Sequence, residues 1–155
     1  MGYTHYFYDN RTRKTQDTKW STITGQIVDI LTDTNLIDLL DNDKEQFQID
    51  KELIMFNGIG DDGHETFYFP RDRNENFNFC KTAHKPYDIC VQISLIVLKY
   101  YLKSEIDIKS DGENSDWQDA NRICKPYLNQ SFIMSLDDGL ISTDDILVLD
   151  TETNN

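Results

Sequence analysis

A short segment in the middle of the chain carries the densest set of residues that could do chemistry. It reads FNFCKTAHKPYD and spans residues 77–88. Its pattern predicts a strand, a loop and a helix start, and the free amides of such a loop suit a phosphate or a carboxylate. The candidate contacts are Lys81 and Lys85 for phosphate, Tyr87 for stacking, His84 and Asp88. The segment therefore predicts an anion-binding loop, with a well-capped helix entrance as the structural alternative.

The cysteines offer less chemistry than their number suggests. Cys80 lies near His84, which would suit a thiol nucleophile, but this spacing is local and unspecific. Cys80 as a small buried hydrophobe is the simpler interpretation. With Cys90 and Cys124 the total is three and no CxxC pair is present, so reduced thiols fit better than disulfides or a zinc finger.

Two histidines are candidates for acid/base work or metal binding. His64 and Glu65 are adjacent, and adjacent residues of a strand point to opposite faces, so we do not expect them to share a site. His5 could meet either only if their strands are neighbours, so we predict structural histidines and no metal. Asp111, in a Ser-Asp-Gly turn, could bind a ribose hydroxyl or make an Asx-turn. No P-loop, dinucleotide fingerprint or GxSxG elbow is present, and the catalytic residues are unknown.

Hydrophobic periodicity predicts the elements that must position these residues. We expect strands over 2–8, 47–56, 64–69, 77–81, 106–110 and 146–149, with 64–69 and 77–81 paired as a hairpin around the loop 70–76. We expect helices over 17–31, 36–40, 86–103 and 115–128. Asp17 or Thr18 would cap the first, and Ser115 or Asp116 would begin the last.

The order of these elements predicts an α+β fold, because strands and helices mix without a strict repeat. We expect a single domain over residues 1–149, with a mixed or antiparallel sheet packed with about three helices and a frayed tail over 150–155. The helix over 86–103 is apolar on most faces and is the expected buried centre.

Charge narrows the classes of partner. The 155 residues carry a net charge of −13, which disfavours duplex nucleic acid and anionic membranes. Residues 104–155 hold twelve acids against three bases, whereas residues 71–103 hold six bases against three acids. The N-terminus lacks a signal peptide, and the longest apolar run, 93–102, is too short to span a bilayer. The predicted anion-binding loop thus lies in a locally positive segment of an acidic, cytoplasmic protein.

Five motifs together resemble a known family. GYTHYF, FNG, HETF, FNFCKTAHKPYD and SDG followed by DW, spanning residues 2–117, are similar in this order to small proteins encoded mostly by tailed bacteriophages and prophages. Members usually have Arg at the position of His84 and often Trp at that of Phe7. The resemblance implies a phage setting in a host cytoplasm, not an activity. Its polar positions imply a shared ligand pocket with no cofactor: Tyr3, His5, Asn57, Glu65, Lys81, Lys85, Tyr87, Asp88, Ser110, Asp111 and Trp117.

Two functional hypotheses follow. The first is a phage accessory protein that binds a small anionic, nucleotide-like ligand, in counter-defence by sequestering or cleaving a host nucleotide signal. The second is an acidic interaction protein that inhibits a host nucleic-acid-binding or defence complex by charge mimicry. Non-catalytic binding is favoured over hydrolysis, and a homo-oligomer is compatible with both hypotheses.

Overall fold

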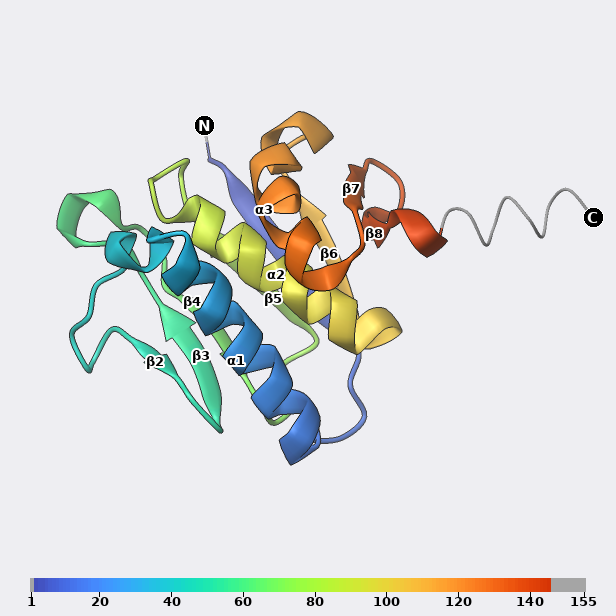
Figure 1. Cartoon of the computed structure of the whole chain (residues 1–155), viewed down its shortest axis with the longest axis horizontal. Helices are drawn as coiled ribbons and strands as arrows, with labels where there is room; N and C mark the ends of the chain where they lie inside the picture. Colours follow the sequence, from blue (N-terminus) through green and yellow to red (C-terminus); the bar gives the residue numbers. More distant parts are fainter. Residues whose placement is uncertain (1, 146–155) are drawn as a thin grey trace, which may run out of the picture.

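The computed structural model describes residues 2–145, and three α-helices and eight strands account for most of this range (Figure 1). The α-helices are α1 (Asp17–Asp33), α2 (Asp88–Leu102) and α3 (Gln118–Leu128). The strands are β1 (Thr4–Asp9), β2 (Gln48–Ile49), β3 (Leu53–Phe56), β4 (Phe67–Pro70), β5 (Phe77–Lys81), β6 (Ile106–Ser110), β7 (Phe132–Ser135) and β8 (Gly139–Ser142). Short 3-10 turns lie at η1 (Leu36–Leu39), η2 (Gly60–Asp62), η3 (Lys103–Glu105) and η4 (Asn114–Trp117).

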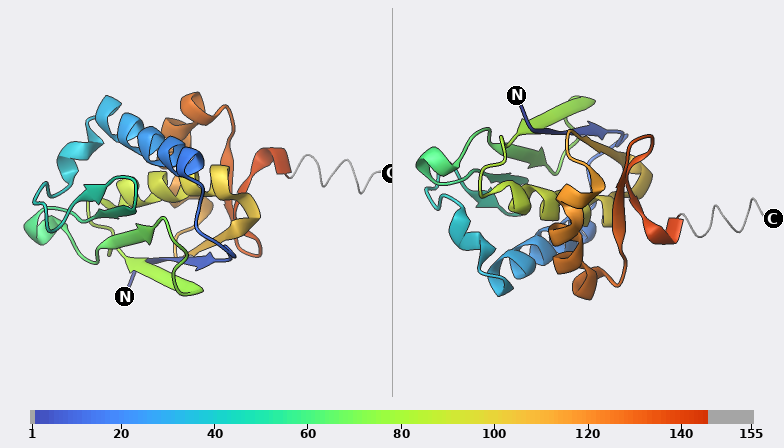
Figure 2. Two further views of the ribbon diagram at one scale, coloured as in Figure 1. Left: turned by 90° about the horizontal axis from the view of Figure 1, so that it is seen from below. Right: turned by 90° about the horizontal axis from the view of Figure 1, so that it is seen from above.

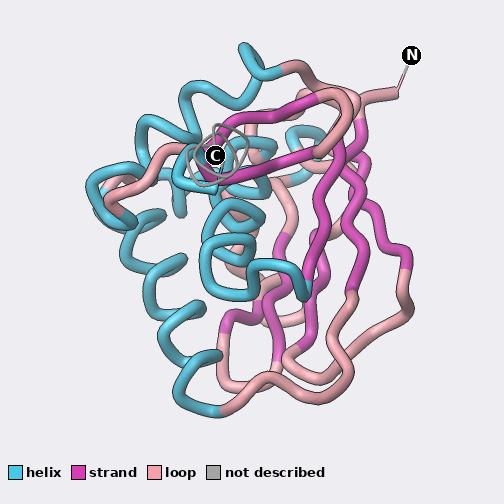
Figure 3. Tube along the Cα trace, turned by 90° about the vertical axis from the view of Figure 1, so that its right-hand side faces the viewer, coloured by secondary structure: helices cyan, strands magenta, loops and turns pink. Residues whose placement is uncertain are grey.

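The strands form three small antiparallel sheets, with the orders β5-β1-β6, β2-β3-β4 and β7-β8. The helices gather mainly on one side of the molecule and the strands on the other (Figure 3). This arrangement confirms the predicted α+β class, and each sheet is antiparallel. No helix within residues 2–145 has the length and apolar character needed to cross a membrane.

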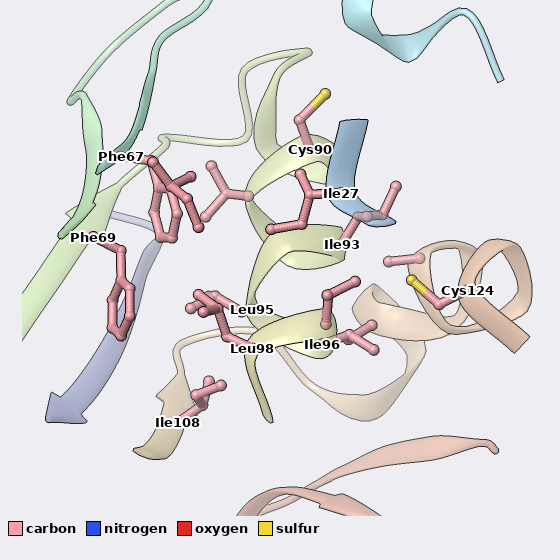
Figure 4. Packing of buried hydrophobic residues seen from close by; sticks show 14 of the residues in the cluster. Ile27, Phe67, Phe69, Cys90, Ile93, Leu95, Ile96, Leu98, Ile108 and Cys124 are labelled. Carbon is pink, nitrogen blue, oxygen red and sulfur yellow. The ribbon is translucent and has the colours of Figure 1, made fainter. Parts of the chain in front are cut away.

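Helix α2 is the middle layer, between the strands and the other two α-helices (Figure 2). Nine consecutive residues, 90–98, are buried because the helix is packed on every side. Its side chains meet Ile27 of α1, Phe67 and Phe69 of β4, Ile108 of β6 and Cys124 of α3 (Figure 4). The prediction of a buried helix near 86–103 is therefore confirmed.

Three predictions about strands need correction. The segment 47–56 is two short strands, because Asp50 caps a turn between them by accepting from the amides of Glu52 and Leu53 at 2.9 and 3.1 Å. The predicted hairpin of 64–69 with 77–81 is wrong, since β4 pairs with β3 and β5 pairs with β1. The β7-β8 hairpin was missed by periodicity, and the strand predicted over 146–149 and the tail over 150–155 lie outside the described residues.

The helix starts also differ from expectation. The N-cap of α1 is Gln16, and Asp17 lies in the first turn, where its carboxylate pairs with Arg71. The last helical segment begins earlier than predicted, since Glu113 caps η4 in a reciprocal capping box with Asp116. Helix α3 ends at Leu128 and is followed by the C-cap Asn129, whose φ of 53° is the left-handed conformation that asparagine tolerates at a helix end.

Candidate functional site

A chain of buried hydrogen bonds centres on His5 in the middle strand of the β5-β1-β6 sheet. The imidazole is 0% exposed. Its Nδ1 lies 2.8 Å from Ser110 Oγ, and its Nε2 lies 2.7 Å from Asp88 Oδ1. We call His5, Thr82, Asp88 and Ser110 the inner network.

Strand register explains why these residues meet. His5 lies opposite Cys80 of β5 and opposite Ser110 of β6, so the three side chains form one row across the sheet. This row faces the helices, and α2 begins above it at Asp88, whose carboxylate lies at the positive end of the helix dipole. Residues from positions 5, 88 and 110 therefore converge because alternate residues of neighbouring strands share a face.

The protonation pattern of the inner network follows from its donors and acceptors. Asp88 Oδ1 accepts from Thr82 Oγ1 at 2.5 Å, so the carboxylate is an acceptor toward His5 as well. His5 then donates through Nε2–H and accepts through Nδ1 from the hydroxyl of Ser110. The oxygen of Ser110 accepts in turn from the Gly112 amide at 2.9 Å. Both ring nitrogens of His5 and the Ser110 hydroxyl therefore have hydrogen-bond partners.

A second buried group lies beside the inner network. Tyr87 is fully buried and donates to the Glu65 carbonyl at 2.5 Å, and the Cys80 thiol lies 3.4 Å from the same carbonyl. Burial raises the pKa of the Cys80 thiol to about 12, although a hydrogen bond with Tyr87 opposes the shift. Such a thiol is not ionised at neutral pH, so Cys80 is not an activated nucleophile with His84.

Aromatic rings pack around His5 of the inner network. Tyr3 is 5% exposed, and burial followed by the charges of Asp88 and Asp116 raises the pKa of its phenol. The exposed His84 ring stacks on Tyr3 at 3.6 Å between centroids, and Trp117 meets the His5 ring edge-on at 5.0 Å. Within residues 2–145, Trp117 Nε1 is the one buried side-chain nitrogen or oxygen without a hydrogen-bond partner.

The loop before α2 differs from the predicted anion cradle. The amides of Asp88, Cys90 and Val91 already donate to the carbonyls of Lys85 and Tyr87. The carboxylate of Asp88 itself occupies the positive end of the helix. Tyr87 offers no open face for a ligand to stack on, because it is buried. This helix start is therefore already filled by the chain's own groups.

The remaining predicted site residues divide between two places. Glu65 and Lys81 lie side by side, since the Glu65 amide donates to the Lys81 carbonyl at 3.1 Å. Asp111 lies on the opposite face of the sheet from His5, where it accepts from the Thr4 amide at 3.0 Å and the Tyr6 hydroxyl at 3.1 Å. The four side chains Glu65, Lys81, Tyr87 and Asp111 therefore do not converge on one cleft. Lys85 lies half-buried in the loop before α2.

Asn57 and His64 belong to a separate turn. Asn57 Oδ1 accepts from the amides of Gly58 and His64 at 2.7 and 3.0 Å, and its Nδ2 donates to the His64 carbonyl at 3.0 Å. These bonds give Asn57 a structural role in the loop around η2. His64 is exposed there, away from the partners of His5. Within residues 2–145, no three His, Cys, Asp or Glu side chains are grouped as metal ligands would be.

The outward face of the same sheet carries a cluster of aromatic rings that sequence reasoning did not single out. We call Tyr6, Tyr8, Phe77 and Phe79 the aromatic face. Phe77 lies 5.3 Å from Tyr8 and 5.9 Å from Phe79 between ring centroids. Phe77 is 46% exposed and Phe79 55%, and no element within residues 2–145 lies over this side of β1 and β5 (Figure 2). The sequence pattern that could have identified this face is the alternation of Phe77, Phe79 and Lys81 along β5.

A cavity of about 560 Å³ lies at the other end of β6. Ser110 and Gly112 line it together with Asn114 of η4, and Met134 and Leu136 of the β7-β8 hairpin add apolar surface. Its volume falls in the range of small-molecule sites. Ser110 therefore belongs both to the inner network and to the lining of this cavity.

Comparisons of the chain with models of protein families, with curated proteins and with solved structures found no match.

Proposed function

We propose that this protein acts by binding another protein, which docks on the aromatic face and carries positive charge. The observation that supports this most is the pair of exposed rings, Phe77 and Phe79, on a sheet face without a covering element in the described chain. Exposed apolar clusters of this kind are typical of interaction surfaces.

The two phenylalanines could contribute substantially to association. About half of each ring is open to solvent, so covering both would remove on the order of 200 Å² of apolar surface. That area corresponds to about 5 kcal/mol before the entropic costs of association. Phenylalanine is also among the aromatic residues enriched at the cores of protein interfaces.

Strand β5 adds hydrogen-bonding groups to the same surface. The pairs 3/82 and 9/76 are hydrogen-bonded across β1 and β5, so the backbone groups of Phe77 and Phe79 point away from β1. Because β5 is the edge of its sheet, a partner strand could pair with it while its side chains meet the rings. Strand addition of this kind is a common mode of peptide recognition.

Charge favours a basic partner. The chain has a net charge of −13, although beside the aromatic face Asp107 and Asp111 of the β6 side alternate with Lys109, and Lys81 lies across Thr4 from Asp111. The charge that favours a basic partner is therefore that of the whole chain. A protein that binds nucleic acid has the complementary charge, which speeds encounter in a salt-dependent way. We therefore propose a host nucleic-acid-binding or defence protein as the partner. This partner would contact the aromatic face, and the overall negative charge of the chain would mimic the charge of nucleic acid.

Affinity capture from a bacterial lysate with matched variants tests this proposal. The double variant Phe77→Ser/Phe79→Ser should lose the captured protein, whereas Tyr68→Ser, which changes a similarly exposed ring (48%) on β4, should keep it. Capture by the wild type should weaken at high salt. Equal capture by the double variant, or capture that salt leaves unchanged, would contradict the proposal.

A nucleotide-like anionic ligand is the second candidate, favoured by one specific arrangement. Phe79 and Lys81 lie two residues apart on the same face of β5, so a base could stack on the ring while Lys81 meets a phosphate. Titration calorimetry against nucleotides and cyclic oligonucleotides tests it. Binding should weaken in Lys81→Ala and Phe79→Ser but persist in Lys125→Ala, an exposed lysine of α3. Absence of heat across the panel would exclude this candidate.

A further inference from the structure

The inner network combines a hydroxyl, an imidazole and a carboxylate in the order that activates a serine. We infer that Ser110 is a nucleophile, with His5 as its base, that attacks small carboxylic esters entering the cavity at the end of β6. The geometry is direct, with 2.8 Å from Ser110 Oγ to His5 Nδ1 and 2.7 Å from His5 Nε2 to Asp88 Oδ1. Nucleophile, base and orienting group within hydrogen-bond reach are the signature of this chemistry.

The hydrogen-bond donors fix the direction of proton transfer. Asp88 accepts from Thr82 and from His5, so the imidazole presents its unprotonated Nδ1 to Ser110. The Gly112 amide donates to Ser110 Oγ at 2.9 Å, and His5 Nδ1, 2.8 Å from the same oxygen, is placed to accept the hydroxyl hydrogen. The two ring nitrogens have exchanged their roles relative to the familiar serine hydrolases, where Nε2 faces the serine. Either nitrogen serves equally well as a base.

The cavity decides the class of substrate. It opens beside Ser110 between the end of β6, η4 and the β7-β8 hairpin, and Met134 and the highly exposed Leu136 give it apolar surface. Glu113 and Lys109 on its rim balance each other in charge. A space of about 560 Å³ with this lining suits a small, uncharged ester with a short acyl group.

The reaction balances with water as the second substrate. Ser110 Oγ bonds to the ester carbonyl carbon while its proton passes to His5 Nδ1. The C–O bond to the alcohol then breaks, and His5 returns the proton to the departing alkoxide. Water attacks the resulting acyl-serine with His5 again as base, releasing the carboxylic acid and the free hydroxyl. Asp88 is a positioning residue that holds the imidazole in its tautomer.

Labelling with a fluorophosphonate tests the inference on the whole chain, because such a probe bonds covalently to activated serines. Mass spectrometry should find one adduct on Ser110. Ser21→Ala, an exposed serine of α1, should label as the wild type does, and Ser110→Ala should not label. His5→Gln should slow labelling at least about 100-fold, the usual loss on removing a general base. Asp88→Asn should lower the maximal labelling rate without changing the half-saturating probe concentration.

The wild-type protein alone can overturn the inference, whatever the variants do to folding. A folded wild type that gives no Ser110 adduct, or that hydrolyses 4-nitrophenyl acetate no faster than Ser110→Ala does, would show that the inner network only ties the sheet to α2. An equal labelling rate in folded His5→Gln would refute the role of His5. These outcomes are independent of capture on the aromatic face, since the two sites lie on opposite faces of the sheet.

Discussion

Asp9 and Arg11 form an ion pair closed off from solvent, and its removal gives a quantitative test of how the sheets are joined. Both side chains are 1% exposed, and Arg11 donates to the two Asp9 oxygens at 2.9 and 2.8 Å. The guanidinium also donates to Thr15 and to the carbonyls of residues 70–72, and it lies 4.5 Å from the Phe69 ring centre. This pair therefore joins β1, the start of α1 and the end of β4.

We expect Asp9→Asn to cost about 3–5 kcal/mol of unfolding free energy, because it leaves the buried guanidinium charge without its partner. Asp9→Asn/Arg11→Met leaves no buried charge unpaired, although it also loses the hydrogen bonds of the guanidinium to Thr15 and to the carbonyls of residues 70–72. The double variant should therefore lose less than the sum of the single variants, by a coupling of about 2 kcal/mol or more. Urea unfolding followed by circular dichroism measures the wild type, Asp9→Asn, Arg11→Met and the double variant.

The same pair predicts a pH dependence with a definite sign. Burial would raise the pKa of Asp9, but hydrogen bonds from Arg11 and from the Asn74 amide, with the charge of Arg11, outweigh it and hold the pKa below its usual value. The stabilisation is therefore complete above the unfolded-state pKa of about 4 and is lost as pH falls through the folded-state value. Asp9→Asn should lack this component. A cost below about 1 kcal/mol at neutral pH for Asp9→Asn would refute the reasoning.

Three further predictions test local features. Gly139→Ala should cost at least about 2 kcal/mol, because φ is 75° there and a Cβ would overlap the Ile108 carbonyl oxygen; thermal and urea unfolding measure it. Gly25→Ala should instead stabilise α1 by roughly 0.5–1 kcal/mol, because it is an exposed helical glycine with open space around it; loss of stability would contradict this. Ellman's reagent should react only after unfolding with the three buried thiols, whose pKa burial raises to about 12: Cys80, Cys90 and Cys124.

Periodicity found most elements because they are strongly patterned. The apolar run of α2 and the alternation of β1 and β5 leave little freedom in which residues face the core. The strand over 47–56 was wrong because Asp50 caps a turn through its own side chain, which an apolar count does not register. The β7-β8 hairpin was missed although its strands are as long as β3 and β4.

The strand pairing predicted from the sequence was also wrong. Residues 64–69 and 77–81 are close in the sequence, which favoured a hairpin, but β5 pairs with β1, more than seventy positions away for Thr4 and Lys81. Local pattern shows that a strand exists and which side is apolar, but the choice of neighbour depends on burial by the whole chain.

For the candidate site, too, the sequence indicated the residues and the tertiary structure decided their contacts. The sequence by itself indicated polar candidates at positions 3–5, 57, 65, 81–88 and 110–117, and it left His5 as a structural or acid/base histidine. Only the tertiary structure decided that His5 meets Asp88 and Ser110, that Tyr87 is buried, and that Asp111 faces the other way. The physical reason is that side-chain identity and alternation are local, whereas the row across β5, β1 and β6 exists only once three distant strands adopt one register.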